Sequence, residues 1–380
     1  MRPRSLVTAL IGLAAVFSAA GRPAADPCSG KRETVDFGEV VRAARTVSAH
    51  NPTVSVPQPG ARHLRLRLSL REAGSCPWKL VIRDGKFRPV QTLVASDFPQ
   101  GRSLWSTRVS GERAYLDLID CENPSQGPSI HMAEYIWLPA NAPIPFYSTK
   151  SDQPDWRPLD SSAVTAHEDR RLGDSVGMLV GVSTVRPRNW SCSGVVIGDG
   201  LFLTNWHCIA PLPDREPASM QGLLIDMSWD GDSVSQDYQV LKFEDGSPEI
   251  DFAILAIEPL GRGVAFRPAA LRTSPPALAE VRLVHHPESQ QKMMSFEGCR
   301  IMGLNVPDRS SPFLSHTCDT AGGSSGSPLF DGDGKVTGLH FCGFDKTAPG
   351  PRVNGAVRTD AIIRCLEGKK RTDLLSRIRH

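Results

Sequence analysis

The sequence carries almost no net charge, has no long apolar run beyond its first residues, and lacks the cysteine and histidine spacings of zinc sites. Its 43 Lys and Arg residues against 41 Asp and Glu give a formal net charge of +2, which offers no reason to expect nucleic-acid binding. Without a CxxC pair or a His cluster, the nine cysteines indicate disulfides rather than a metal site. We therefore expect no metal and no cofactor.

The first 20 residues are typical of a secretory signal peptide. Arg2 and Arg4 precede an apolar stretch, Leu6–Phe17, which is followed by small residues. About a dozen apolar residues fall short of the roughly 20 that cross a bilayer. We expect cleavage before Gly21, with a site after Ala25 as the alternative, and a secreted or periplasmic protein without stable membrane insertion. Cysteines pair as disulfides in such an oxidising compartment.

The length of 380 residues suits two domains plus a leader. Its 33 glycines and 31 prolines separate short runs of β-branched and aromatic residues, which predicts an all-β protein. Residues 21–60 are polar and Pro-rich and predict a loosely ordered lead-in. Residues 61–140 contain evenly spaced alternating segments such as Leu64–Leu70, which predict a small antiparallel β-sandwich.

Residues 141–171 predict a linker, in which Arg170 and Arg171 indicate either a processing site or a solvated charged loop. Short strands then resume over about 200 residues, enough for two packed six-stranded β-barrels with a cleft between them. Thr359 is expected to cap a short C-terminal helix that closes a domain of residues 172–368. Residues 369–380 predict a solvated basic tail.

Three short segments place His207, Asp251 and Ser325 in this order along the second half of the chain: TNWHC, DFAIL and GGSSGSP. A serine hydroxyl becomes a good nucleophile when a base takes its proton, and a carboxylate can hold that base in the right tautomer. Each segment alone is compatible with a structural role. In combination they predict a catalytic triad, and the backbone amides of Gly323 and Ser325 predict an oxyanion hole.

These residues resemble the chymotrypsin-fold serine proteases over roughly residues 172–368. The chain looks most like the bacterial glutamyl endopeptidases, because Thr320 stands five residues before Ser325 and His340 stands fifteen after it. The resemblance implies that this hydroxyl and this imidazole hold a glutamate side chain, since such donors stabilise a desolvated carboxylate. The N-terminal domain resembles, diffusely, the CUB-like or convertase-accessory β-sandwich of some exported bacterial proteases.

Asp319, six residues before Ser325, leaves the specificity open. Trypsin-like enzymes carry at this point the aspartate that selects Arg or Lys, whereas some glutamyl-type relatives have an aspartate here that is turned elsewhere. We predict cleavage after Glu or Asp, with cleavage after Arg or Lys as the alternative.

The resemblance also implies a disulfide between Cys192 and Cys208, which would pin the loop that bears His207. The other predicted pairs are Cys76 with Cys121, Cys299 with Cys318, and Cys342 with Cys365, which leaves Cys28 over.

Two further features concern the surroundings of the triad. Trypsin-like zymogens are activated when a new N-terminal amine pairs with an aspartate directly before the nucleophile, but this chain has Ser324 there, so we do not expect activation by that ion pair. His285 and His286 precede Pro287 and are interpreted as structural or cleft-rim residues rather than metal ligands.

The sequence therefore predicts a serine endopeptidase that acts on protein or peptide substrates. The alternative is a protease-like binding protein without activity, although such proteins usually lack a member of the triad.

Overall fold

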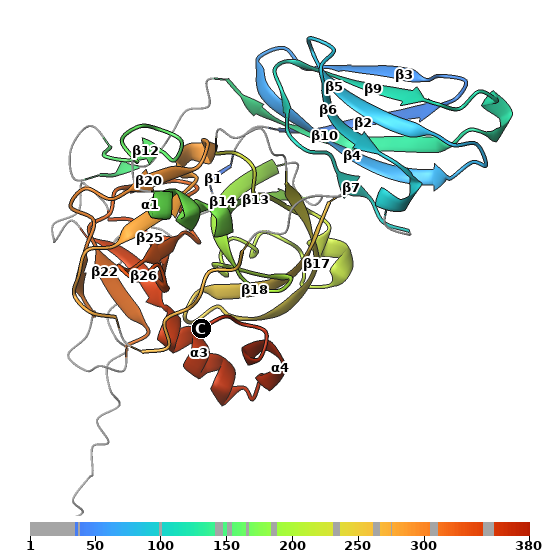
Figure 1. Cartoon of the computed structure of the whole chain (residues 1–380). Coiled ribbons are helices and arrows are strands. Elements are labelled where there is room, and N and C mark those ends of the chain that lie inside the picture. Colours follow the sequence, from blue (N-terminus) through green and yellow to red (C-terminus); the bar gives the residue numbers. More distant parts are fainter. Residues whose placement is uncertain are drawn as a thin grey trace, which may run out of the picture.

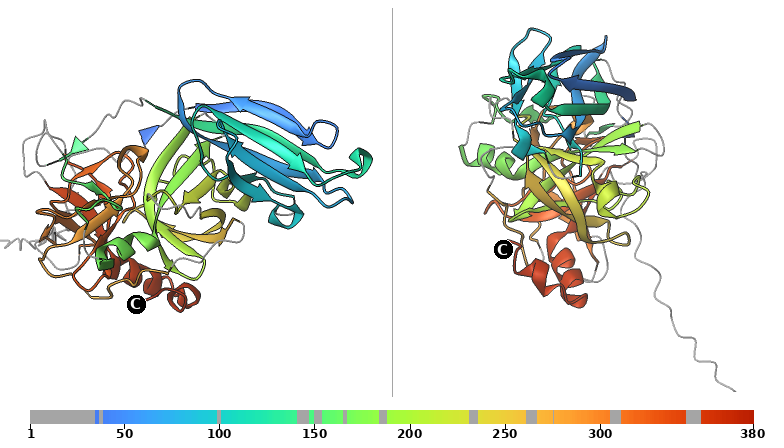
Figure 2. Two further views of the ribbon diagram at one scale, coloured as in Figure 1. Left: turned by 45° about the horizontal axis from the view of Figure 1, so that its top comes forward. Right: turned by 90° about the vertical axis from the view of Figure 1, so that its right-hand side faces the viewer.

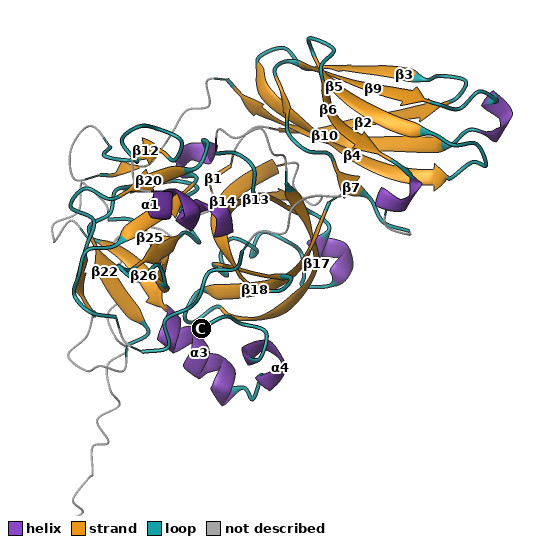
Figure 3. Ribbon diagram, in the orientation of Figure 1, coloured by secondary structure: helices purple, strands orange, loops and turns teal. Residues whose placement is uncertain are grey.

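The structure, a computed structural model, describes residues 35–36, 39–98, 101–140, 147–149, 154–164, 167–183, 188–230, 236–260, 267–274, 276–304, 311–344 and 353–380. The predicted signal peptide and Cys28 lie outside these residues. Figure 1 shows three β-rich parts, an N-terminal sandwich and two neighbouring barrels, with helices at the C-terminus. Strands dominate and the helices are short (Figure 3). In the described part of the chain, no helix has the length and apolar character needed to cross a membrane.

The N-terminal sandwich consists of two antiparallel sheets, seen from two further sides in Figure 2. Its strands are β2 (Glu39–Ser48), β3 (Thr53–Pro57), β4 (Ala61–Glu72), β5 (Lys79–Asp84), β6 (Pro89–Leu93), β7 (Leu104–Trp105), β8 (Val109–Ser110), β9 (Arg113–Ile119) and β10 (Ser129–Pro139). One sheet has the order β2–β10–β4–β7, with β8 also paired to β4, and the other has the order β3–β9–β5–β6. Apolar side chains from both sheets, such as Leu66 of β4 and Leu80 of β5, are fully buried in a common core.

The prediction of a loosely ordered lead-in over residues 21–60 is wrong for its second half, because β2 and β3 are strands of the sandwich. Val54 and Val56 of β3 belong to the buried core. They alternate with Thr53 and Ser55 along the strand, which is the pattern of a half-buried strand.

The first barrel is formed by β13 (Val176–Ser183), β14 (Arg188–Gly198), β15 (Leu201–Thr204), β16 (Leu223–Asp226), β17 (Asp237–Ser247) and β18 (Phe252–Pro259). The strand order β14–β13–β16–β17–β18–β15 closes because β15 also pairs with β14. The short strand β1 (Val35–Asp36) adds to β14 opposite Trp190 and Ser191. This part confirms the prediction of a six-stranded barrel.

The second barrel contains β19 (Arg282–His285), β20 (Met293–Ser295), β21 (Ile301–Gly303), β22 (Phe313–His316), β24 (Pro328–Phe330), β25 (Val336–Cys342) and β26 (Asn354–Arg358). Six strands follow the order β19–β24–β25–β26–β22–β21, and a bridge between Glu280 and Arg300 joins the residues that precede β19 and β21. β20 extends the sheet as the hairpin partner of β19.

The shorter helical elements connect or close these parts. They are α1 (His167–Leu172), α2 (Pro217–Met220), α3 (Thr359–Gly368), α4 (Thr372–Leu375) and the 3₁₀ helices η1 (Ala95–Asp97), η2 (Pro124–Gln126), η3 (Gly173–Ser175) and η4 (Pro287–Ser289).

The predicted linker, residues 141–171, is in part docked on the second barrel. β11 (Tyr147–Ser148) pairs with β23 (Thr320–Ala321), and β12 (Arg157–Pro158) pairs with β20. Arg170, one of the two basic residues considered as a processing site, lies in α1 and donates to the backbone oxygen of Val164 at 2.9 Å. This arginine therefore fastens the segment instead of standing free in a loop.

The C-terminal region differs from its prediction in two respects. Arg358, not Thr359, is the N-cap residue of α3, and the Thr359 hydroxyl bonds instead to the backbone oxygen of Val336 at 3.0 Å. The tail after residue 368 is not simply solvated, because Leu374 and Ile378 are buried in the same core as the barrels.

Three predicted disulfides are present, Cys76–Cys121, Cys192–Cys208 and Cys299–Cys318. The predicted bond between Cys342 and Cys365 is wrong: Cys365 is a free thiol, and Cys342 is disulfide-bonded elsewhere. The helix that carries Cys365, α3, begins beside Val336 at the start of β25. Cys342 lies at the other end of this strand, which spans roughly 20 Å.

The sandwich is fastened to the first barrel by a buried ionic cluster. Arg65 of β4, 1% exposed, contacts Asp226 and Asp237 of the barrel, the latter at 3.3 Å. Burial alone would raise the pKa of Asp226, but the guanidinium groups of Arg108 and Arg65 hold it below its usual range. The ring of His63 meets that of Trp229 edge-on at 5.1 Å. The N-terminal sandwich is thus an integral part of the folded chain.

Candidate active site

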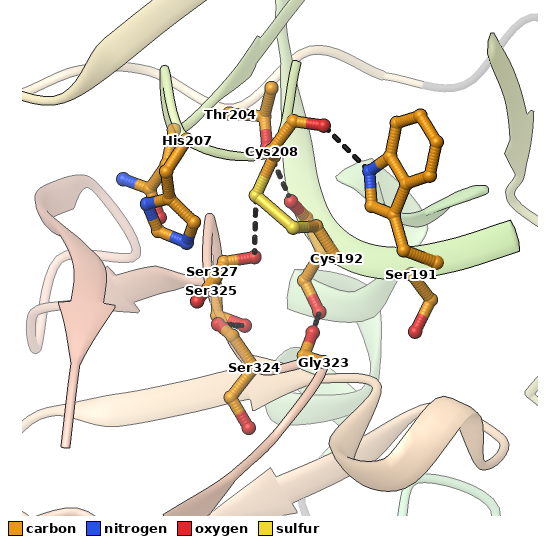
Figure 4. Close-up of a disulfide and its surroundings, with 12 residues drawn as sticks. Ser191, Cys192, Thr204, His207, Cys208, Gly323, Ser324, Ser325 and Ser327 are labelled. Atoms are coloured by element: carbon orange, nitrogen blue, oxygen red, sulfur yellow. Dashed lines mark hydrogen bonds between the residues drawn. A yellow bond between two sulfur atoms is a disulfide. The ribbon is translucent and has the colours of Figure 1, made fainter. Parts of the chain in front are cut away.

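The turn that bears His207 follows β15 and is held from two sides. The Cys192–Cys208 disulfide ties it to β14 (Figure 4), and Trp190 donates its indole N–H to the backbone oxygen of Cys208 at 2.7 Å. Buried Asn205 donates its side-chain amide to the backbone oxygen of Asp251 at 2.9 Å. The turn after β15 and the start of β18 are therefore joined directly.

Asp251 contacts His207 through both carboxylate oxygens. Oδ2 lies 2.8 Å from Nδ1 of His207, and Oδ1 accepts the backbone N–H of His207 at 2.9 Å. Asp251 is 2% exposed and has φ of 55°, a left-handed conformation that strains a residue with a side chain. Since Nδ1 faces a carboxylate, it carries the proton and Nε2 is the basic nitrogen. Nε2 bonds to no described residue.

Ser325 lies on the tight turn between β23 and β24, and this turn contacts both barrels. The backbone oxygen of Ser325 accepts the N–H of Ser193 in β14 at 2.7 Å. The N–H of Gly326 donates to the backbone oxygen of His340 in β25 at 2.8 Å. Gly326 has φ of 87°, and a Cβ atom there would lie 2.0 Å from the oxygen of Ser193, so only glycine fits. Figure 4 shows Ser325 and His207 beside the Cys192–Cys208 disulfide.

The backbone on the N-terminal side of Ser325 is fixed by donors from two other elements. The oxygen of Gly322 accepts the N–H of Glu288 in η4 at 2.6 Å, and the oxygen of Gly323 accepts the Ser193 hydroxyl at 2.9 Å. Gly323 has φ of 89°, which glycine adopts without strain. Because a trans peptide is planar, the N–H of Gly323 points away from Glu288.

Thr320 and His340, the two predicted pocket residues, are each hydrogen-bonded to a buried polar side chain. Asn354 donates to Thr320 Oγ1 at 3.1 Å, so the Thr320 hydroxyl can donate its own proton outward. Cys318 N–H donates to Nδ1 of His316 at 3.3 Å, and Nε2 of His316 then donates to Nδ1 of His340 at 3.1 Å. This order leaves Nε2 of His340 as an N–H donor.

Burial keeps both of these imidazoles neutral. It lowers the pKa of His316 to about 3, and it lowers the pKa of His340 well below its ordinary value, with a further contribution from neighbouring His316. The pair therefore provides hydrogen-bond donation without a permanent buried cation.

Asp319, the residue that left the specificity open, is 1% exposed. Its Oδ2 accepts the backbone N–H of Asp155, in the segment docked on the second barrel, at 3.1 Å. A carboxylate that accepts a backbone amide in this way is held toward the docked segment.

His285 and His286 are fully buried, so their interpretation as cleft-rim residues is wrong and the structural interpretation holds. Nδ1 of His285 lies 2.8 Å from Oγ of Ser324, the residue before the predicted nucleophile. The N–H of His286 donates to the Ser193 hydroxyl at 2.9 Å, and burial lowers the pKa of its ring to about 4. Sequence reasoning missed these supporting contacts, as well as those of His316, because no local spacing signals them.

Among the described residues, one group of metal-type donors lies close together: Cys192, His207 and Cys208. The two sulfur atoms are bonded to each other, so they offer no thiolate, which is the form of cysteine that binds metals.

Residues 192–339 match the family described as trypsin-like peptidase domain. The inactive form of a serine-to-alanine mutant of Rv3671c from M. tuberculosis H37Rv is 18% identical, covering 57% of this chain and 96% of that one, with a TM-score of 0.39. The active form of the Rv3671c protease is 18% identical, covering 60% of this chain and 93% of that one, with a TM-score of 0.39. Deg5 is 20% identical, covering 54% of this chain and 93% of that one, with a TM-score of 0.40. No curated protein matches.

The two-barrel architecture and the matched domain define a chymotrypsin-like fold. The chain carries a trypsin-like peptidase domain and is a serine endopeptidase that acts on proteins or peptides.

Proposed function

We propose that this endopeptidase works through an acyl-enzyme on Ser325, with His207 as general base and Asp251 as the residue that orients it. The observation that carries the proposal is the 2.8 Å contact between Nδ1 of His207 and Oδ2 of Asp251. It leaves Nε2 basic and beside the turn that holds Ser325.

In the first half of the reaction, Nε2 of His207 takes the Ser325 proton while Oγ attacks the carbonyl carbon of the substrate. The imidazolium then gives this proton to the leaving amine. Water attacks the acyl-enzyme in the second half, with His207 again as base and then as acid. The carboxylate of Asp251 stabilises the transient imidazolium and does not itself take the proton.

We place the oxyanion of the tetrahedral intermediate at the N–H groups of Gly323 and Ser325. The supporting observation is that the backbone oxygens of Gly322 and Ser324, which share their peptide planes with these two N–H groups, accept the N–H groups of Glu288 and Ser327. The turn is therefore set before the substrate arrives, and such preorganised donors need no reorganisation during the reaction.

We further propose cleavage after Glu, with Asp second. The Thr320 hydroxyl and Nε2 of His340 are suitable donors for a desolvated carboxylate. The alternative, cleavage after Arg or Lys, requires the carboxylate of Asp319 in the pocket, and its contact with the N–H of Asp155 speaks against that.

A secreted or periplasmic location is part of the proposal. It is supported by the signal-like first 20 residues and by three disulfides, which persist in oxidising compartments.

Covalent labelling with a fluorophosphonate tests the proposed nucleophile. We expect intact-mass analysis of the folded protein to give one adduct, located on Ser325 by peptide mapping, because Ser325 is partly exposed beside His207 (Figure 4), whereas Ser324 is fully buried. The adduct should be absent in Ser325→Ala, greatly reduced in His207→Ala and unchanged in Ser376→Ala, whose hydroxyl is exposed far along the tail. A folded wild type without an adduct would favour the non-catalytic binding protein.

A further inference from the structure

Ser324, which directly precedes the proposed nucleophile, is fully buried and is held by a hydrogen bond on each side of its hydroxyl. Oγ accepts the backbone N–H of Ala321 at 3.1 Å and lies 2.8 Å from Nδ1 of His285. The Ser324 proton is directed to Nδ1, because the other ring nitrogen, Nε2, faces a hydroxyl that donates its own proton elsewhere and Nε2 therefore carries the ring proton.

The same imidazole continues the chain of hydrogen bonds on its other side. Nε2 of His285 lies 3.4 Å from Oγ of Ser295, and that hydroxyl donates to the backbone oxygen of Asp319 at 2.9 Å. The Ser295 oxygen is therefore the acceptor for Nε2–H. This set of hydrogen bonds, named the His285 circuit, runs from Ala321 through Ser324, His285 and Ser295 to Asp319 and joins both ends of the segment 319–324 to β19 and β20.

The segment that precedes the first barrel covers the His285 circuit. The indole ring of Trp156, 8% exposed, meets the His285 ring edge-on at 5.4 Å and packs with Met293 and Ala321. Asp155 donates its N–H to the side chain of Asp319 at 3.1 Å.

Backbone pairing fixes this segment on both sides of Trp156. β11 pairs with Thr320–Ala321, β12 pairs with β20, and the N–H of Leu159 donates to Lys292 at 3.1 Å. Thr320, a residue of the predicted specificity pocket, is thus paired directly with β11.

We propose that residues 154–159, together with β11, form a positioning element of the active site, with Trp156 as its central residue. By excluding water from the His285 circuit, the element keeps Ser324 and the adjoining amides of Gly323 and Ser325 in the arrangement that catalysis needs. The proposal rests on the proposed role of Ser325 as nucleophile.

The physical need for a cover follows from the chemistry of the circuit. Its bonds join neutral groups, and a neutral hydrogen bond contributes only about 0.5–1.5 kcal/mol when water competes for the same donors and acceptors. The same bonds are stronger in a dry, low-dielectric interior. Burial lowers the pKa of His285 well below its ordinary value, so the ring stays neutral and both of its nitrogens keep the roles assigned above.

The full-length chain tests the proposal through the rate at which a fluorophosphonate labels Ser325. We expect Trp156→Ala to lower this rate at least about 10-fold, because small displacements at a reacting group cost up to about 100-fold. Trp156→Phe, which keeps a ring against His285, should restore most of the rate. Trp105→Ala is the matched control: that indole is 3% exposed and packs between the sandwich and the first barrel. The labelling rate of Trp105→Ala should stay within about 2-fold of wild type, although its thermal midpoint should fall at least as far as that of Trp156→Ala.

A double-mutant cycle with Ser324→Ala separates positioning from general destabilisation. Because both changes interrupt the same circuit, the double variant should label no slower than the slower single variant. Fully additive losses, or equal rates for Trp156→Ala and Trp105→Ala, would overturn the proposal. A wild type that is not labelled at all would instead overturn the proposed function.

Discussion

His340 should decide whether this enzyme prefers glutamate, and His340→Ala is the perturbation that tests it. In the folded chain, His316 donates to Nδ1 of His340 at 3.1 Å, so Nε2–H is the donor offered to a substrate. A hydrogen bond to a charged group contributes about 1.5–3 kcal/mol. Loss of this donor should therefore lower kcat/KM for a glutamate substrate about 10- to 150-fold.

The assay compares two peptides that differ only in Glu or Gln at the residue before the cleaved bond. The two side chains have almost the same shape, so the ratio of their kcat/KM values measures recognition of the charge and cancels changes in the triad. We expect a ratio well above 1 in the wild type and a ratio close to 1 in His340→Ala. His316→Ala should give an intermediate ratio, because it removes the group that fixes the His340 tautomer.

The same ratio should depend little on pH. Burial, aided by His316, lowers the pKa of His340, and Nδ1 of His340 already accepts the N–H of His316, so the ring stays neutral when a glutamate binds. The Glu-to-Gln ratio should therefore change little as pH falls from about 8 to about 6, above the ordinary glutamate pKa of about 4.3.

Asp319→Asn provides the opposing measurement, since the amide oxygen can still accept the N–H of Asp155 while the charge is gone. Glutamate cleavage should persist in this variant. The reasoning is refuted if the wild type cuts only after Arg and Lys and loses that activity in Asp319→Asn, or if His340→Ala leaves the Glu-to-Gln ratio unchanged.

Four other predictions concern stability and covalent structure. Arg65→Ala removes the partner that two buried carboxylates share and leaves Asp226 with Arg108 alone, so it should cost about 3–5 kcal/mol of unfolding free energy. Lys79→Ala, in an exposed pair, should cost less than about 1 kcal/mol, and equal losses in denaturant titrations would contradict the buried cluster. Burial lowers the pKa of five histidines of the described chain, so below about pH 6.5 the unfolded chain binds more protons than the folded one. Their contribution to stability is complete above that pH, and the thermal midpoint should fall as the pH is lowered. A midpoint that stays constant down to about pH 5 would be inconsistent with neutral buried rings. Replacing Cys192 and Cys208 together by Ala removes a bond that closes a loop of 16 residues. It should cost about 3 kcal/mol of unfolding free energy and up to about 100-fold in rate. Cys365 should be alkylated in the unfolded, unreduced chain, and alkylation seen only after reduction would argue against a free thiol there.

Much of the architecture could be predicted from local pattern. Alternating segments such as β4 and apolar runs such as β18 mark strands because their side chains face a core on one or both sides. The order of His207, Asp251 and Ser325 could be read directly, and the contact between the first two has the expected atoms. These features depend on residues that are close in sequence or on a motif with a fixed chemical purpose.

The docked segment could not be predicted, because its order comes from its partners. β11 and β12 contain two residues each, too few for a period of two to appear, and their Pro-rich surroundings are typical of loops. Only the strands β23 and β20, more than a hundred residues away, give them a ladder to join. The error over the pair Cys342 and Cys365 has the same origin, since the distance along β25 is a property of the folded sheet.

The proposed pocket and the turn of the proposed nucleophile both contain a neutral imidazole whose tautomer is set by a buried polar group. The Cys318 amide sets His316 and through it His340, and the Ser295 hydroxyl sets His285. A permanent cation in either place would have to be desolvated on folding, at a cost of several kcal/mol that an incomplete set of partners does not offset. A neutral ring avoids this cost in the free enzyme and still offers one N–H as a hydrogen-bond donor. Histidine is suited to both places because its ordinary pKa lies close to neutral pH, and the depth of burial decides on which side of neutrality each ring remains.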